Sequence, residues 1–423
     1  MFSIRTLLTI KFDVWVYTAF LLATTTFFFL DPEAYAPKIV VVGAAWILLG
    51  IIVARRTFRF RAVFLLVLGY FLLIQVSKFG NLGAYSSVQD LIYPWGLVNI
   101  LFLLYFLSED RLFALKVIDR YISIFAYLSA PSIFFFFALM FNLGLDYQLI
   151  TLGGREEMLY RNYYNLAIFG DYQILSFENF TIARLAGMFE EAGMLGTYVS
   201  ILLAADLIAF PEKGLRKVVL LILGALSLSL AFYLFLPFIV TYVAIKKKAA
   251  MSMIFLLCVI AGAIAFVPNP LKDAFSNLVV ERFRISEEGF LEGDTRYIEY
   301  SAQYSDYLAA VTAPELAFGH GARSNRLDHA ANYASYQSIV YEGGFLGLLL
   351  VLSFAGYLLF WIPLRNRDYL TCVLSFFPFL SLYQRPDFLS SYFIVIYAAI
   401  FFTSLKNAKH AKSYRGRRQI VAA

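Results

Sequence analysis

The sequence has few charged residues and very little cysteine or histidine. Asp, Glu, Lys and Arg together make up 15% of 423 residues, and the chain holds only 2 Cys and 3 His. Hydrophobic residues reach 61% and aromatic residues 18%, which is far from the composition of a soluble domain. Cys258 and Cys372 both lie within apolar runs, so no disulfide framework is indicated. This composition predicts an integral membrane protein.

Several familiar motifs are also missing. The sequence contains no phosphate-binding glycine loop, no nucleophile elbow, no zinc-ligand spacing and no internal repeat. We therefore expect neither a metal nor another cofactor. The net charge of +6 gathers in short segments between the apolar runs and in the tail, which is a topology signal. Nucleic acid is consequently not an expected partner.

What the sequence does have is long hydrophobic runs, and these predict an all-α membrane fold. Runs long enough to cross a bilayer lie near residues 14–30, 38–54, 61–77, 91–107, 117–141, 193–210, 251–267, 342–363, 368–384 and 388–405. The uncharged stretch 218–245 is longer than one helix needs, and lysine-rich segments flank both of its ends. Because both flanks favour the cytoplasm, we expect two crossings with a bend near Ser227–Ala231. The total is about twelve transmembrane helices.

The basic flanks also predict an orientation. Both termini fall on the cytoplasmic side, with a cytoplasmic tail at 406–423. Two large loops, at about 142–187 and 268–335, then fall on the external side. The middle of the second loop, 281–307, has charged and apolar residues spaced as in an amphipathic helix on a membrane surface. We expect residues 1–423 to form a single polytopic membrane domain with these loops as its external cap.

The first candidate site lies at the mouth of an apolar run, in the segment Arg184–Gly196. Charge at this depth is by default a functional-site hypothesis. If the helix starts near Arg184, then Gly187 and Glu191 share one face and Glu190 points elsewhere. The alternative is structural: an interfacial arginine that reaches lipid phosphate, and a glutamate favoured by the helix dipole.

Further candidates lie in the second loop and near the C-terminus. Arg296 presents a planar fork that matches phosphate oxygens, although it could instead pair with a neighbouring carboxylate at the surface. His320 stands between two glycines and can act as an acid or a base near neutral pH. The secondary candidates are Glu190, Arg323, His329 and Arg385.

Three short motifs carry a resemblance to a known family. They are Arg184–Gly196, the pair Phe318-Gly-His-Gly321 and Tyr341-Glu-Gly-Gly-Phe-Leu-Gly347, and the turn Tyr383-Gln-Arg-Pro-Asp387. Across residues 150–405 the chain resembles the bacterial O-antigen and capsule polymerases (Wzy-type), which are relatives of the O-antigen ligases. One position departs from the family pattern, because Ala192 stands where proline is usual.

This resemblance implies a membrane glycosyltransferase in the bacterial inner membrane, with a fold similar to the GT-C type and the two large loops on the periplasmic side. The donor would be a growing glycan on a polyprenyl diphosphate, and the acceptor one lipid-diphosphate-linked repeat unit. Arg184 and Arg296 would bind the diphosphate. Glu191 or His320 would orient or deprotonate the attacking hydroxyl. Neither metal nor nucleotide is required, and the implied partners include membrane lipid, a chain-length regulator and a flippase.

Two alternatives remain at this stage. The ligases usually carry a histidine 11 residues before a glycine-rich helix start, but here that position falls on Asn332 or Tyr333. This favours the polymerase, although the nearby His329 keeps the ligase as an alternative. A polysaccharide or lipid transporter (a flippase) would more often show internal repeats and charges near the middle of the bilayer. Here the predicted spans are nearly uncharged and the charges cluster at one external face, which argues against a transporter.

Overall fold

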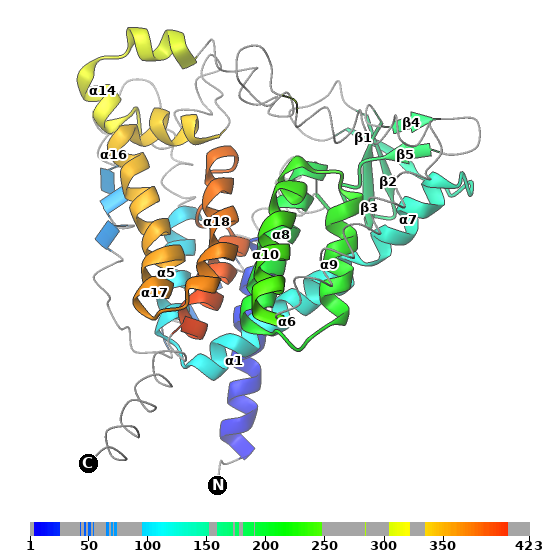
Figure 1. Cartoon of the computed structure of the whole chain (residues 1–423), viewed down its shortest axis with the longest axis horizontal. Coiled ribbons are helices and arrows are strands. Elements are labelled where there is room, and N and C mark those ends of the chain that lie inside the picture. Colours follow the sequence, from blue (N-terminus) through cyan, green and yellow to red (C-terminus); the bar gives the residue numbers. More distant parts are fainter. Residues whose placement is uncertain are drawn as a thin grey trace. The chain divides into compact units, whose positions relative to one another are not determined.

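The computed structural model describes residues 4–25, 95–151, 159–171, 174–176, 181–189, 191–247, 304–321 and 335–404, with isolated positions between 43 and 73 and at 284. The fold is mostly helical (Figure 1). Within these ranges, three helices are long and apolar enough to cross a membrane: Arg111–Met140, Ala192–Ala209 and Tyr336–Arg365. The helical membrane character expected from the sequence is therefore present. The total of about twelve spans stays a prediction.

The chain divides into two compact units, each built from two separate segments. The first unit comprises Met1–Gly43 and Leu115–Gly293, and the second comprises Ala44–Ala114 and Asp294–Ala423. In each unit, a shorter segment from the N-terminal part of the chain packs with a longer segment from later in the sequence. The expected single polytopic domain remains a prediction.

Helices α8, α9 and α10 form the centre of the first unit, where α8 packs against the other two (Figure 1). Pro131 begins a new helix directly after Ala130, because proline fits the first turn of a helix, where no backbone N–H is needed. Phe125, Phe189 and Tyr198 stack in the core with ring centroids 4.8 to 6.1 Å apart. The helices of this unit are α1 (Ile4–Ala23), α6 (Arg111–Ser129) from Leu115 onward, α7 (Pro131–Met140), α8 (Ala192–Ala209), α9 (Leu215–Leu226) and α10 (Leu230–Lys247).

The predicted break within the uncharged stretch 218–245 is confirmed. Helix α9 ends at Leu226 and α10 begins at Leu230, with Leu228 in a left-handed backbone conformation (φ +45°). Small residues let these helices approach one another closely. A Cβ atom added to Gly196 would lie 2.3 Å from Ser229 Cβ, and one added to Gly224 would lie 2.0 Å from the Phe232 ring. The helix packing of this unit therefore requires glycine at both positions.

The first large loop contains β-strands, so the all-α prediction is wrong for this segment. β1 (Gln148–Thr151), β2 (Leu159–Tyr163) and β3 (Ala167–Gly170) form an antiparallel sheet, and β4 (Ile174–Ser176) pairs with β5 (Thr181–Ala183). The strands are rich in aromatic and β-branched residues, which favour extended structure on a half-buried surface. Because the hydropathy pattern selects only long apolar runs, it did not reveal strands this short.

The second unit packs its helices around aromatic side chains. Phe354 and Tyr397 meet edge to face with centroids 5.7 Å apart, and the Nε atom of Arg111 donates a hydrogen bond to the Phe402 carbonyl. The Asp368 side chain caps the helix that begins at Tyr369, because it accepts a hydrogen bond from the Thr371 N–H. The described elements are α5 (Trp95–Ser108), α14 (Ala313–Phe318), α16 (Tyr336–Gly356), a π-helical turn (Tyr357–Trp361), α17 (Ile362–Arg365), α18 (Tyr369–Gln384) and a helix at Ser391–Ser404.

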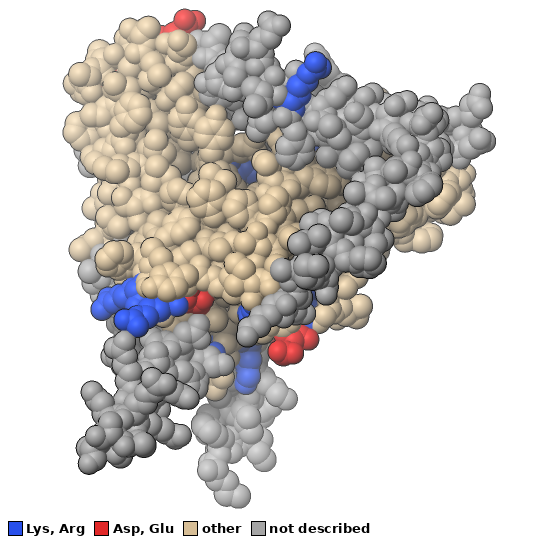
Figure 2. Space-filling model, viewed as in Figure 1, with Lys and Arg blue, Asp and Glu red and all other residues tan. Residues whose placement is uncertain are grey.

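The surface is consistent with a membrane environment. Figure 2 shows one face of the chain, on which most of the described residues are uncharged and Lys, Arg, Asp and Glu occur in a few small groups. Large apolar side chains such as Leu215, Phe134 and Leu349 are more than half exposed, which suits contact with lipid tails.

Candidate functional site

Arg184 lies immediately after β5 and is 6% exposed. Backbone hydrogen bonds hold its segment on both sides. The Leu185 N–H donates to the Leu226 carbonyl at the end of α9, and the Ala186 N–H donates to the Ile168 carbonyl of β3. The Ile168 N–H in turn donates to the Gly187 carbonyl at 2.8 Å. The backbone next to Arg184 is thus held between the sheet and the end of α9.

The predicted helix start near Arg184 is wrong. Helix α8 begins at Ala192, and Glu191 is its N-cap residue with an extended backbone (φ −133°, ψ 139°). The pairing of the Arg184 segment with β3 already satisfies its backbone groups in an extended form, so no helical turn is needed there. Gly187 makes the turn between the two segments with φ +61°. Arg184 and Glu191 therefore flank a tight loop and do not share a helix face.

This loop has a charged residue at each end, Arg184 and Glu191, and lies next to an aromatic core. Glu191 is half-buried at the N-terminus of α8, where the helix dipole favours a carboxylate. Phe189, within the loop, is fully buried, and its ring centroid lies 4.8 Å from that of Tyr198. A buried guanidinium in such a low-dielectric setting interacts strongly with an anionic ligand.

In the second unit, the structure joins two motifs that are separate in the sequence. The His320 N–H donates to the Tyr341 carbonyl at 2.8 Å, and the Gly321 N–H donates to the Glu342 carbonyl at 2.8 Å. We call this contact of residues 317–321 with residues 341–344 the glycine joint. It places His320 directly beside the first turns of α16.

Glycine is required on both sides of the glycine joint. Gly319 has φ 73° and ψ −175°, and Gly344 has φ 63° and ψ −174°, a backbone region that is essentially restricted to glycine. A Cβ atom on Gly344 would lie 2.2 Å from the Ala317 carbonyl oxygen, and one on Gly319 would lie 2.5 Å from the Glu342 backbone. The glycines of these motifs therefore serve a close approach of two backbones.

His320 lies between aromatic rings and a carboxylate. Its ring centroid is 4.6 Å from that of Tyr341 and 5.8 Å from that of Tyr307. Its Nδ1 atom is 3.9 Å from Glu315 Oε1, and its side chain is 18% exposed. This setting leaves His320 partly open to solvent with a carboxylate that can orient it, as a general base requires.

Glu315 is held in its ionised form by Thr312. The Thr312 hydroxyl donates to Glu315 Oε2 at 2.7 Å, and the Thr312 N–H donates to the same oxygen at 3.0 Å. These two hydrogen bonds lower the pKa of the Glu315 carboxyl, and the nearby His320 lowers it further. The carboxylate beside His320 is thus negatively charged at neutral pH.

Five tyrosines surround this region, and we call them the tyrosine cluster. Tyr304 is 5.9 Å from Tyr307 and 6.1 Å from Tyr336, and Tyr307 is 5.0 Å from Tyr341. Tyr336 stacks on Tyr383 at 5.1 Å, which brings in the end of α18. Through Tyr383 the third short motif contacts the tyrosine cluster.

Sequence reasoning identified His320 but missed its surroundings. Glu315 follows Thr312 by three residues, a spacing typical of a helix N-terminus that could have indicated the pair. Gln337 is fully buried, and its amide has no hydrogen-bond partner within the described ranges. Nothing in the local sequence marks Gln337, because its burial depends on how α16 packs.

The remaining candidates are distributed as follows. Arg184 and Glu191 belong to the first unit, whereas His320 and Arg385 belong to the second. Arg385 is the C-cap of α18, and its N–H donates to the Ser381 carbonyl. Glu190, Arg296, Arg323, His329 and most of the expected amphipathic segment 281–307 lie outside the described residues. In the part of the chain that is described, no three His, Cys, Asp or Glu side chains gather as a metal site would need.

Comparison with known proteins gives no match. No family model fits the sequence, and neither a curated protein nor a solved structure is significantly similar to it.

Proposed function

We propose that this protein is a polysaccharide polymerase that transfers a growing glycan from a polyprenyl diphosphate to a lipid-diphosphate-linked repeat unit at the external face of the bacterial inner membrane. The observation that carries the proposal is the glycine joint. It joins the two segments of the second resemblance motif beside Glu315, and the tyrosine cluster adds Tyr383 from the third motif. Segments that resembled the family only by chance would have no reason to lie together, so their proximity supports the proposal.

The second unit supplies what an acceptor sugar needs. A tyrosine ring offers an apolar face and a hydroxyl group, which suit the mixed surface of a sugar. His320 takes the proton of the attacking sugar hydroxyl, and Glu315 stabilises the imidazolium that results. The hydroxyl oxygen then forms a bond to the anomeric carbon of the donor, and the electron pair of the broken bond leaves with the diphosphate.

Arg184, considered within the first unit alone, is the proposed diphosphate ligand because of the chemistry and burial of its own side chain. The guanidinium of Arg184 can donate two parallel hydrogen bonds to phosphate oxygens, and its burial strengthens them. It thereby stabilises the negative charge that develops as the diphosphate departs. Glu191, the N-cap residue of α8, is the alternative to His320 for orienting or deprotonating the attacking sugar hydroxyl. Arg296 is the second proposed diphosphate ligand.

The finer features of the fold belong to the same proposal. They are about twelve spans, cytoplasmic termini, external loops at about 142–187 and 268–335, a GT-C-like arrangement, and a chain-length regulator and a flippase as partners. No metal or nucleotide enters the proposed reaction, since diphosphate is already a good leaving group.

The test is reconstitution of the full chain in liposomes with a synthetic lipid-diphosphate repeat unit, with product length as the readout. His320→Gln, which preserves side-chain size, should slow polymerisation by about 10²–10⁴-fold. Arg184→Ala should slow it by about 10²–10³-fold. Arg161→Ala is the matched control, because Arg161 pairs with Asp171 on the sheet of the same unit and should leave the ladder of products unchanged.

Each variant is first shown to be folded by its thermal unfolding. Normal ladders in both His320→Gln and Arg184→Ala would refute the assignment of these residues. In cells, short capped repeats are expected from the same variants, whereas a complete loss of capping would indicate a ligase.

A further inference from the structure

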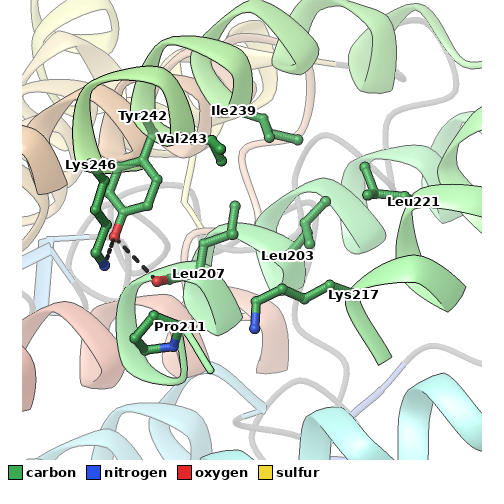
Figure 3. Close-up of a pocket in the computed structure, with 9 residues that line it drawn as sticks. All are labelled: Leu203, Leu207, Pro211, Lys217, Leu221, Ile239, Tyr242, Val243 and Lys246. Carbon is green, nitrogen blue, oxygen red and sulfur yellow. Dashed lines mark hydrogen bonds between the residues drawn. The ribbon is translucent and has the colours of Figure 1, made fainter. Parts of the chain in front are cut away.

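A cavity of about 200 Å³ lies between helices α8, α9 and α10 of the first unit (Figure 3). Its walls are mainly aliphatic, and none of its nine lining residues is acidic. The apolar side chains that line it are Leu203, Leu207, Pro211, Leu221, Ile239 and Val243. Such walls suit a hydrocarbon chain and offer little to a small hydrophilic ligand.

Polar groups approach this cavity from two sides. Figure 3 shows Lys246, the Tyr242 hydroxyl and the Leu207 carbonyl connected on one side, with Lys217 on the other. The Tyr242 hydroxyl donates to the Leu207 carbonyl at 3.2 Å and accepts a hydrogen bond from the Lys246 ammonium. The Lys217 ammonium lies 2.9 Å from Asp206 Oδ2. The cavity therefore combines apolar walls with two ammonium groups.

Positive charge exceeds negative charge around the cavity. Besides the two lysines of the lining, Lys213 in the turn between α8 and α9 and Arg216 in the first turn of α9 carry positive charge. Two carboxylates, Asp119 and Asp206, pair with this group. With the exposed Glu212 of the same turn included, four cations stand against three anions, and the local excess of positive charge favours a negatively charged ligand.

We infer that this cavity binds one acyl chain of an anionic phospholipid, whose phosphate lies beside Lys246 and the Tyr242 hydroxyl. The apolar walls account for the chain, and the excess of cations accounts for the negative headgroup. A free anion would leave the aliphatic walls unused, and a neutral lipid would leave the charge uncompensated. The lipid would bind α10 to α8 and α9, and this role does not depend on the proposed enzymatic activity.

The experiment measures thermal unfolding of the full chain in detergent with added phosphatidylglycerol, phosphatidylcholine or inorganic phosphate. Phosphatidylglycerol alone should raise the melting temperature in a saturable manner. Lys246→Gln should weaken its apparent affinity about five-fold, the loss expected when one lysine near an anionic headgroup is removed. Val243→Phe, which fills the cavity, should abolish the response.

Lys116→Gln is the matched control, since Lys116 is an exposed cation of α6 outside the lining and should leave the response unchanged. Equal stabilisation by phosphatidylcholine, or by inorganic phosphate alone, would overturn the inference, as would an equal phosphatidylglycerol response in Lys246→Gln and Lys116→Gln. If Val243→Phe does not fold, the number of phosphatidylglycerol molecules retained by the native chain and by Lys246→Gln in mass spectrometry decides the question. Because no readout uses glycan synthesis, failure here is distinct from failure of the proposed function.

Discussion

At the scale of single residues, the strongest interactions of the first unit are buried ion pairs at the ends of its helices. Arg216 is 3% exposed and donates to both Asp119 and Asp206, and Asp206 is fully buried. Removing water from such charges is expensive, so each depends on its partner being present. The pairs hold the start of α9 against α6 and α8, beside the lipid cavity proposed above.

Arg216 should therefore matter more than its more exposed neighbour Lys213, which pairs with the same Asp119. Arg216→Met leaves buried carboxylate charge poorly compensated and should cost about 3–5 kcal/mol. Lys213 has a half-exposed side chain, and Lys213→Met should cost at most about 1 kcal/mol. Denaturant unfolding in detergent measures both. Equal losses in the two variants would contradict this ranking.

The Thr312–Glu315 pair predicts a dependence on pH. The folded-state pKa of Glu315 is lowered below its ordinary value, so the stability it contributes is present above that value and is lost as the pH falls through the folded pKa. Thr312→Val removes the hydroxyl donor and should raise the folded pKa toward the unfolded value, so that the variant is less stable near neutral pH and loses less stability on acidification than the unmodified chain. The melting temperature, followed between about pH 3 and pH 7, measures the shift.

The control for this prediction is Thr151→Val, because Thr151 is exposed on β1 in the other unit. Its acid profile should match that of the unmodified chain. A profile for Thr312→Val that coincides with both would show that the hydroxyl does not hold the Glu315 carboxylate.

At the scale of secondary-structure elements, the glycine joint is a contact between backbones. α14 and α16 meet through carbonyl and N–H groups at Tyr341 and Glu342, and the kink at Gly344 lets α16 continue past that contact. α16 is thus non-helical at Gly344, next to the residues that bind the Gly319–Gly321 segment. Local irregularity of this kind is frequent where a site is assembled.

Two glycines of the same helix should respond in opposite ways. Gly344→Ala places a methyl group against the Ala317 carbonyl in a backbone region closed to alanine, and should cost at least about 3 kcal/mol. Gly356 lies in regular helix with no atom closer than 4.0 Å to an added Cβ, so Gly356→Ala should stabilise by about 0.5–1 kcal/mol. Thermal unfolding distinguishes them. A neutral Gly344→Ala would mean that the joint is not closed in solution.

At the scale of the whole molecule, the first unit has two chemically different ends along α8. One end of α8 follows the Arg184–Glu191 loop and the strands, and the other leads to Lys213 in the next turn and to Arg216 at the start of α9. Eighteen residues of helix extend about 27 Å, close to the thickness of a bilayer core. The basic end should therefore face the cytoplasm.

This orientation can be tested by labelling single cysteines in intact cells, in a background where Cys258 and Cys372 are replaced by serine. Thr151→Cys on β1 should react with a membrane-impermeant maleimide from outside, because that end is expected to be external. Glu212→Cys in the turn after α8 should react only once the membrane is permeabilised. Both positions are exposed. The opposite labelling pattern would reverse the predicted topology.

Much of the helical scaffold could be predicted from hydropathy and flanking charge. The run 193–210 corresponds to α8 at Ala192–Ala209, and the bend near Ser227 was correctly placed. The site was less predictable. A helix starting at Arg184 was expected because charge and glycine stood next to an apolar run, yet the preceding strands hold that segment extended. Sequence spacing within one element cannot reveal pairing with another.

The sequence alone thus determined that this chain is apolar enough for a membrane, where many of its helices lie and which short motifs carry unusual polar residues. Those properties depend on composition and on local periodicity, which are fixed along the chain. Only the tertiary structure decided that Arg184 directly follows a strand, that Glu191 caps α8, and that His320 lies beside Glu315 and the tyrosine cluster. These arrangements depend on contacts between residues distant in sequence, whose geometry is set by packing and backbone pairing.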